Sequence, residues 1–140
     1  MTGCAPVEGP GNFYAASILD HVLPGMPAFD EELFGPVVVV LRAKNLDEAI
    51  RIANATDYAL TGGVYSRSPA AIERVGREMT AGNLYINRGI TGALVGRQPF
   101  GGYRLSGVGS KAGGPDYLLQ FMIPKVVSEN TLRRGFASSD

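Results

Sequence analysis

The side chains of this sequence that could do chemistry gather at two places, and the first is an acid pair. Glu31 and Glu32 stand with Phe34 in EELFGPVVVV, directly before a run of four valines. A carboxylate at a turn that enters a parallel strand can accept two charge-assisted hydrogen bonds from a vicinal diol such as a ribose. The nearby aromatic ring can lie against a planar heterocycle. A capping acid followed by a core phenylalanine explains the same spacing, so the pattern alone leaves both interpretations open.

The second place is the glycine-rich stretch of residues 88–114, RGITGALVGRQPFGGYRLSGVGSKAGG. The glycines that cluster over residues 82–114 indicate close backbone approaches, and a loop as long as residues 88–114 in a compact domain is usually functional. Within it, GVGSKA matches the G-x-G-x-x-A dinucleotide fingerprint. No strand is expected before this motif, however, and Gly113 and Gly114 follow where a helix should continue. We therefore reject it as a phosphate-binding motif.

Two further groups, one thiol and one imidazole, predict no site. Cys4 is the only cysteine and His21 the only histidine. A catalytic thiol needs a pKa lowered by a helix N-terminus or a cation, and nothing beside Cys4 in the sequence offers either. A lone histidine without ligand-spaced partners predicts no metal site. The single cysteine also excludes an internal disulfide and suits a reducing compartment.

The length and the charge balance restrict the class of protein. The 140 residues allow one domain at most, and 13 basic side chains cancel 13 acidic ones. No electrostatic field that would attract nucleic acid or a membrane surface is therefore expected. The N-terminus has no signal-peptide pattern, and no stretch approaches the roughly 20 apolar residues of a membrane helix. We expect a protein of the cytoplasm or of an organelle matrix.

The elements that must position these groups follow an alternating α/β pattern. Strands are expected over residues 13–19, 37–41, 60–66 and 83–87. The unbroken valines indicate a strand covered on both faces. Strands that alternate with helices predict a parallel sheet with right-handed βαβ crossovers. Ligands bind beyond the carboxyl ends of such strands, which is where the glycine-rich stretch begins.

Local signals also place the helices and divide the chain. Asp30 is expected to cap a short helical turn that carries the acid pair. Asn45 and Ser68 are expected to open two longer amphipathic helices, the second with proline at its first position. We expect a loop, a core that includes the glycine-rich substrate loop, a helix followed by a C-terminal strand, and a tail, over residues 1–12, 13–114, 115–128 and 129–140.

Taken together, these stretches resemble the aldehyde dehydrogenase superfamily. EELFGPV resembles its E-x-F-G-P-V segment, DEAIRIANATDYALTGGVYS resembles the stretch that follows, and AGNLYINR and QPFGGYRLSGVGSKAGG resemble its C-terminal motifs in the correct order. The likeness runs from about residue 8 to about residue 128. NRGITGALVGRQPFGG with SKAGGPDYLLQF is most similar to the 1-pyrroline-5-carboxylate dehydrogenases, which oxidise L-glutamate γ-semialdehyde to glutamate in proline catabolism.

The resemblance implies roles for five residues. Glu32 would bind the nicotinamide-ribose hydroxyls of NAD or NADP, and Phe34 would pack against the nicotinamide end of that cofactor. Gly92 and Ala93 would hold the substrate's α-carboxylate through backbone N–H groups, since small residues let the backbone approach closely. Phe100 would line the aldehyde channel. The implied partner is a small aldehyde that carries an α-carboxylate.

The resemblance also implies that the catalytic groups lie elsewhere. The family's thiol nucleophile, general-base glutamate, oxyanion-hole asparagine and nucleotide-binding domain precede the E-x-F-G-P-V segment, and Cys4 does not take the nucleophile's place. No catalytic residue is therefore expected in this chain, which alone should be inactive. We expect the C-terminal part of a catalytic domain plus an oligomerisation-type strand, from an enzyme that is a homo-oligomer at full length. The alternative is a non-catalytic module that associates with full-length dehydrogenase subunits through its C-terminal strand.

Overall fold

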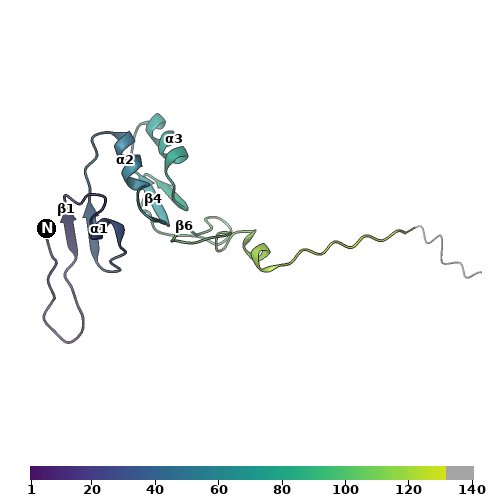
Figure 1. Ribbon diagram of the computed structural model, residues 1–140, viewed down its shortest axis with the longest axis horizontal. Coiled ribbons are helices and arrows are strands. Elements are labelled where there is room, and N and C mark those ends of the chain that lie inside the picture. The colour runs from purple at the N-terminus through teal and green to yellow at the C-terminus, as the bar shows by residue number, and fades with distance from the viewer. Residues whose placement is uncertain (132–140) are drawn as a thin grey trace, which may run out of the picture.

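The computed structural model describes residues 1–131 and shows a mixed α/β structure (Figure 1). Its elements, in chain order, are β1 (Ser17–Asp20), α1 (Pro27–Asp30), β2 (Val37–Val40), α2 (Leu46–Ala53), β3 (Tyr58–Ala59), β4 (Thr61–Val64), α3 (Pro69–Glu78), β5 (Asn83–Ile86), β6 (Tyr103–Arg104) and the 3-10 helix η1 (Tyr117–Phe121). The predicted alternation of strands and helices is confirmed.

The strands of the described residues form three two-stranded sheets, so the prediction of one parallel sheet is wrong. β1 pairs in parallel with β2, β4 pairs in parallel with β5, and the short β3 and β6 pair antiparallel. Each parallel pair is joined through a helix, as parallel strands require a crossover connection. After α2 the chain enters β3, which pairs with β6. The next strand, β4, lies beside β5 and does not extend the pair of β1 and β2.

The valine strand β2 is exposed, although an unbroken apolar strand predicts cover on both faces. Val38 is 54% exposed, and Val37 and Val40 are 36% and 37% exposed, so the described residues leave this strand largely uncovered. The chain as a whole exposes 11196 Å², whereas a compact monomer of 14.8 kDa exposes about 7,000 Å². Much apolar surface is therefore left uncovered by the chain's own residues.

The best-packed region lies where α2 and α3 meet β4 and β5. Ile50 of α2, Val75 of α3 and Tyr85 of β5 are all buried. The two helices begin where the sequence predicts, because Asn45 and Ser68 each accept a hydrogen bond from a backbone N–H of the first turn, at 2.9 and 3.3 Å. Such caps satisfy donors that a helix cannot satisfy itself.

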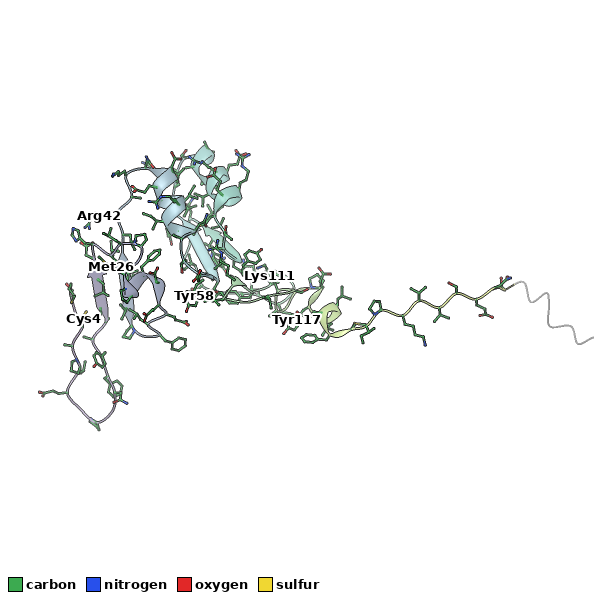
Figure 2. The ribbon with its side chains drawn as sticks, viewed as in Figure 1. Cys4, Met26, Arg42, Tyr58, Lys111 and Tyr117 are labelled. Atoms are coloured by element: carbon green, nitrogen blue, oxygen red, sulfur yellow. The ribbon has the colours of Figure 1, made fainter. Side chains whose placement is uncertain are left out.

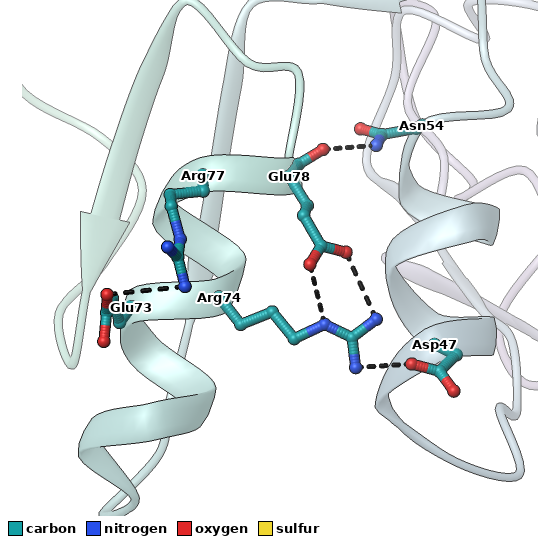
Figure 3. A network of polar contacts seen from close by, with 6 residues as sticks. All are labelled: Asp47, Asn54, Glu73, Arg74, Arg77 and Glu78. Atoms are coloured by element: carbon teal, nitrogen blue, oxygen red, sulfur yellow. Dashed lines mark hydrogen bonds and ion pairs between the residues drawn. The ribbon is translucent and has the colours of Figure 1, made fainter.

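A polar network joins both ends of α2 to the C-terminal half of α3 (Figure 3). Arg74 of α3 donates to Glu78 from Nε at 2.8 Å and also pairs with Asp47 of α2. The Asn54 side chain donates to the Glu78 carbonyl and accepts from the Thr80 N–H, both at 2.7 Å. The hydrogen bond from Arg74 lowers the pKa of the Glu78 carboxyl, and the same bond raises the pKa of Arg74.

The short helix α1 precedes the acid pair instead of carrying it. Pro27 occupies the first turn, where its fixed φ favours helix initiation. The helix ends at Asp30, and the N–H of Glu31, already extended, donates to the Pro27 carbonyl at 2.9 Å. Asp30 therefore ends this helix, and the prediction that it caps a turn carrying Glu31 and Glu32 is wrong.

The C-terminal strand expected near residues 122–127 does not form in this chain. η1 is a short 3-10 turn, and residues 122–127, which follow it, belong to no strand and run away from the rest of the structure (Figure 1). A strand exists only when a neighbour receives its backbone hydrogen bonds, and no described strand lies alongside. Ile123 is accordingly 95% and Val126 89% exposed. Residues 132–140 of the expected tail lie outside the described residues.

Candidate functional site

The glycine-rich loop leaves the carboxyl end of β5, and side chains of that strand hold both of its arms. Asn83 and Tyr85 are alternate residues of β5, so their side chains leave the same face. Tyr85 donates from its hydroxyl to the Gly92 carbonyl at 2.5 Å. Asn83 donates to the Pro99 carbonyl at 2.9 Å and accepts from the Gly101 N–H at 3.1 Å.

Phe100 is fixed between the two residues that Asn83 binds. Its N–H and carbonyl exchange hydrogen bonds with Ala112, at 2.9 and 2.8 Å. The Lys111 ammonium donates to the carbonyls of Gly82 and Gly101, at 2.5 and 2.6 Å. The backbone on either side of Phe100 is therefore held to β5 and to the end of the loop, which sets where its half-buried side chain lies.

Two glycines of this region are required by its geometry. A Cβ on Gly82 would lie 1.9 Å from the Gly101 carbonyl oxygen, so the two backbones can touch only without a side chain there. Gly92 has a φ of +99°, in the left-handed region that favours glycine. The expectation that clustered glycines mark close backbone approaches is confirmed at Gly82.

Gly92 and Ala93 lie together at the surface of the loop. Both are exposed, and within residues 1–131 the N–H of neither donates to a protein acceptor. Arg88 lies beside them: its guanidinium is 5.1 Å from the Tyr85 ring centroid and donates to the Thr91 carbonyl at 3.4 Å. Exposed backbone N–H groups next to a cation can bind an anion such as a carboxylate.

Glu32 and Phe34 lie in another region, between α1 and β2. Both are exposed, Phe34 at 91%, and its φ of +35° is rare for a bulky residue. Phe34 lines a cavity of about 490 Å³ together with Cys4, Tyr14 and Val37, and no residue of the glycine-rich loop lines that cavity.

The structure thus brings the three predicted substrate residues to one strand and leaves the two predicted cofactor residues beside another sheet. Figure 2 shows the separation through two labelled residues. Cys4, which lies near the predicted cofactor residues, is well apart from Lys111, which lies near the predicted substrate residues. A single site that includes Glu32 and Gly92 therefore stays a prediction.

The sequence analysis missed Asn83, Tyr85 and Lys111. The available signal was a strand with a polar and an aromatic residue at alternate positions immediately before a long loop. Lys111 lies in the rejected GVGSKA motif, whose residues 107–112 follow no strand directly and enter no helix. Its ammonium is occupied by two backbone carbonyls, so the lysine organises the loop.

Comparison with known proteins then assigns the chain to a family. The sequence model described as "Aldehyde dehydrogenase family" matches residues 1–127. This chain belongs to the aldehyde dehydrogenase family. The 1-pyrroline-5-carboxylate dehydrogenase of Geobacillus sp. (strain WCH70) is 50% identical to it over 129 residues, which are 92% of this chain and 25% of that protein. The chain spans about a quarter of the length of such curated relatives.

Solved structures of aldehyde dehydrogenases and related enzymes agree in fold. Proline utilization A (PutA) from Bdellovibrio bacteriovorus has a TM-score of 0.86 and 60% identity, covering 95% of this chain and 14% of that one. The 1-pyrroline-5-carboxylate dehydrogenase from Thermus with bound NAD has a TM-score of 0.83 and 50% identity, covering 86% of this chain and 23% of that one. The resemblance drawn from the motifs is confirmed.

The described part of this aldehyde dehydrogenase chain contains no helix with the length and apolar character needed to cross a membrane; the longest described helix, α3, has ten residues. In residues 1–131, no three histidine, cysteine or acidic side chains are grouped to hold a metal ion.

Proposed function

We propose that this chain supplies the C-terminal part of an NAD(P)-dependent aldehyde dehydrogenase that oxidises L-glutamate γ-semialdehyde to glutamate. The observation that carries the proposal is the loop after β5, which exposes the backbone of Gly92 and Ala93 on one arm and fixes Phe100 on the other. Backbone donors for a carboxylate, paired with an aromatic side chain for a methylene chain, suit this substrate. The similarity to 1-pyrroline-5-carboxylate dehydrogenases supports the same assignment.

The cofactor contacts are proposed for Glu32 and Phe34. Phe34 is held almost fully exposed in a left-handed backbone conformation, and such strained positions gather at functional sites. Its ring is therefore free to lie against a nicotinamide, while the exposed Glu32 carboxylate accepts hydrogen bonds from the ribose hydroxyls. A relative from Thermus has been crystallised with bound NAD.

In this proposal the attacking thiol comes from the part of a longer dehydrogenase that this chain does not match. Cys4 is exposed and its Sγ donates only a long contact of 3.8 Å to the Thr2 carbonyl. The exposed valines of β2 also support a longer dehydrogenase. An apolar strand of this kind is stable when it is covered, and in this proposal the cover comes from the part that this chain does not match.

A chimera tests the proposal. Residues 8–128 replace the matching quarter of the Geobacillus 1-pyrroline-5-carboxylate dehydrogenase, and NADH formation is followed with the semialdehyde and with propanal. The chimera should oxidise the semialdehyde. Phe100→Ala should lower kcat/KM for the semialdehyde by about tenfold or more, because packing on the methylene chain is lost. Equal losses for propanal would remove Phe100 from the substrate site.

One observation favours a second candidate, a non-catalytic module that binds full-length dehydrogenase subunits. Residues 122–127 are extended, mostly apolar and outside any strand, so they can add to a sheet edge of another chain. Co-elution of the chain with a full-length dehydrogenase, lost when Ile123 and Val126 are both replaced by Asp, would support this candidate. A monomer that melts sharply on its own would exclude it.

A further inference from the structure

We propose that Tyr85 is a positioning residue for the carboxylate, because its hydroxyl sets the orientation of the Gly92–Ala93 peptide group. The role deepens, and rests on, the function proposed above for Gly92 and Ala93. Tyr85 is 6% exposed, which makes it one of the few buried side chains of the described residues, and its hydroxyl points at residues 88–97 of the loop, which are all exposed. A buried donor therefore holds an exposed surface segment.

The geometry of one peptide unit links this hydrogen bond to the substrate. The Gly92 carbonyl and the Ala93 N–H belong to the same planar trans peptide, in which C=O and N–H point in opposite directions. Because the Tyr85 hydroxyl holds the carbonyl at 2.5 Å against β5, the Ala93 N–H is directed away from the strand. That N–H meets no acceptor within the described part of the chain, so it remains available for an anion.

Gly92 makes this orientation attainable. Its φ of +99° lets the chain reverse directly after Thr91, so that the carbonyl can turn back toward β5. A peptide next to a glycine is also free to rotate, and without a partner for its carbonyl the Ala93 N–H would sample both directions. The Tyr85 hydroxyl removes this freedom, which lowers the entropy cost of binding a carboxylate.

Arg88 completes the arrangement from above the Tyr85 ring. Its guanidinium lies 5.1 Å from the Tyr85 ring centroid and donates to the Thr91 carbonyl at 3.4 Å. The aromatic ring thus supports a cation beside the free N–H groups while its hydroxyl orients one of them. Tyr85→Phe keeps the ring and the cation and removes only the hydrogen bond, so it isolates the orienting effect.

Amide NMR on the complete 140-residue chain tests the role of Tyr85. L-Glutamate is titrated into wild type, Tyr85→Phe and Tyr65→Phe, and the shift of the Ala93 amide is followed. Tyr65 is a matched control, because it is exposed and its hydroxyl makes no hydrogen bond within residues 1–131. γ-Aminobutyrate, which is glutamate without its α-carboxylate, is the control ligand.

We expect a saturable shift of the Ala93 amide with L-glutamate and little shift with γ-aminobutyrate. Tyr85→Phe should bind L-glutamate about three- to tenfold more weakly, as loss of one neutral hydrogen bond implies, and Tyr65→Phe should match wild type. Equal binding by wild type and Tyr85→Phe would overturn the role of Tyr85 alone. No shift at Ala93 in wild type would overturn the carboxylate site and Tyr85 with it.

The amide signals of α2 and α3 show whether Tyr85→Phe disturbs the isolated chain. If it does, the role of Tyr85 is tested by the kinetics of the chimera. There the substitution should raise KM for the semialdehyde about three- to tenfold with kcat nearly unchanged, and leave KM for propanal unaltered. A fall in kcat for both aldehydes would instead mark Tyr85 as a residue of general structural importance and would contradict a positioning role.

Discussion

Asn83 and Tyr85, alternate residues of β5, each bond to the backbone of the same glycine-rich loop, one on each arm. Alternate residues of a strand share a face, so their spacing fixes the distance between the two arms. The register of one short strand thereby decides where Gly92 and Phe100 lie relative to each other. A strand is a rigid support for a site that is otherwise built on loop backbone.

Asn83 should therefore control the placement of Phe100. Asn83→Ala leaves the Pro99 carbonyl and the Gly101 N–H without partners, at a cost of about 1–3 kcal/mol. In the chimera we expect Asn83→Ala to lower kcat/KM for the semialdehyde more than it lowers kcat/KM for propanal. Asn83→Asp keeps the acceptor for the Gly101 N–H and loses the donor to the Pro99 carbonyl. Its activity with the semialdehyde should therefore lie between that of the parent chimera and that of Asn83→Ala. An unaltered ratio in Asn83→Ala would argue that other contacts suffice to hold Phe100.

Lys111 should hold the second half of the loop against β5. Its ammonium bridges the carbonyls of Gly82 and Gly101, and Lys111→Met removes both bonds while keeping much of the side-chain volume. Exchange of the Ala112 amide, which bonds to the Phe100 carbonyl, should become about tenfold faster or more. Lys125→Met, at an exposed lysine, is the control and should leave that rate unchanged. Equal exchange in Lys111→Met and wild type would show that the lysine bridge is dispensable.

Asp20 at the end of β1 should make the first sheet sensitive to acid. The paired hydrogen bonds from Arg42 lower the pKa of the Asp20 carboxyl from 3.8 to about 2, with a smaller effect from the His21 N–H. A carboxyl whose pKa is lower in the folded state stabilises it above its unfolded pKa, and this stabilisation disappears as the pH falls through the folded pKa.

The contribution of Asp20 should thus be constant at neutral pH and decline between about pH 4 and pH 2. The Arg42 side chain is 62% exposed and the Asp20 side chain 32% exposed, so solvent screens the pair, the effect on stability is small, and a direct NMR titration of the carboxyl is the better measurement. Arg42→Gln should return the titration midpoint toward its ordinary value. A midpoint that is already ordinary in wild type would show that the ion pair does not persist in solution.

Glu32→Gln tests the proposed cofactor contact without changing the shape of the side chain. In the chimera the substitution should raise KM for NAD or slow hydride transfer, because a neutral amide accepts weaker hydrogen bonds from a ribose diol than a carboxylate does. Glu31→Gln, at the neighbouring exposed acid, serves as the comparison. Identical kinetics for Glu32→Gln and the parent chimera would remove the ribose role.

Local signals in the sequence predicted α2 and α3 well, and contacts between distant residues account for much of what the sequence did not predict. Asn45 and Ser68 cap α2 and α3 as expected, because a cap is decided by residues three positions apart. The pairing of β3 with β6 joins residues more than 40 positions apart in the chain, and no pattern within either strand reveals it.

Two predictions failed for a related reason: that the valine strand is buried, and that residues 122–127 form a strand. A run of valines indicates that something covers the strand, without indicating that the cover comes from the same chain. The candidate site shows the same division: Gly92, Ala93 and Phe100 follow from motif likeness, whereas the hydrogen bond from Tyr85 to Gly92 depends on how the loop closes.

The central claim is that this chain recognises an aldehyde through its α-carboxylate. The most direct measurement is the ratio of kcat/KM, in the chimera, for L-glutamate γ-semialdehyde and for γ-aminobutyraldehyde, which lacks only that carboxylate. Two charge-assisted hydrogen bonds from the loop predict a ratio of about one hundred or more. A ratio near one would contradict the account, because the loop after β5 would then contribute nothing to the choice of substrate.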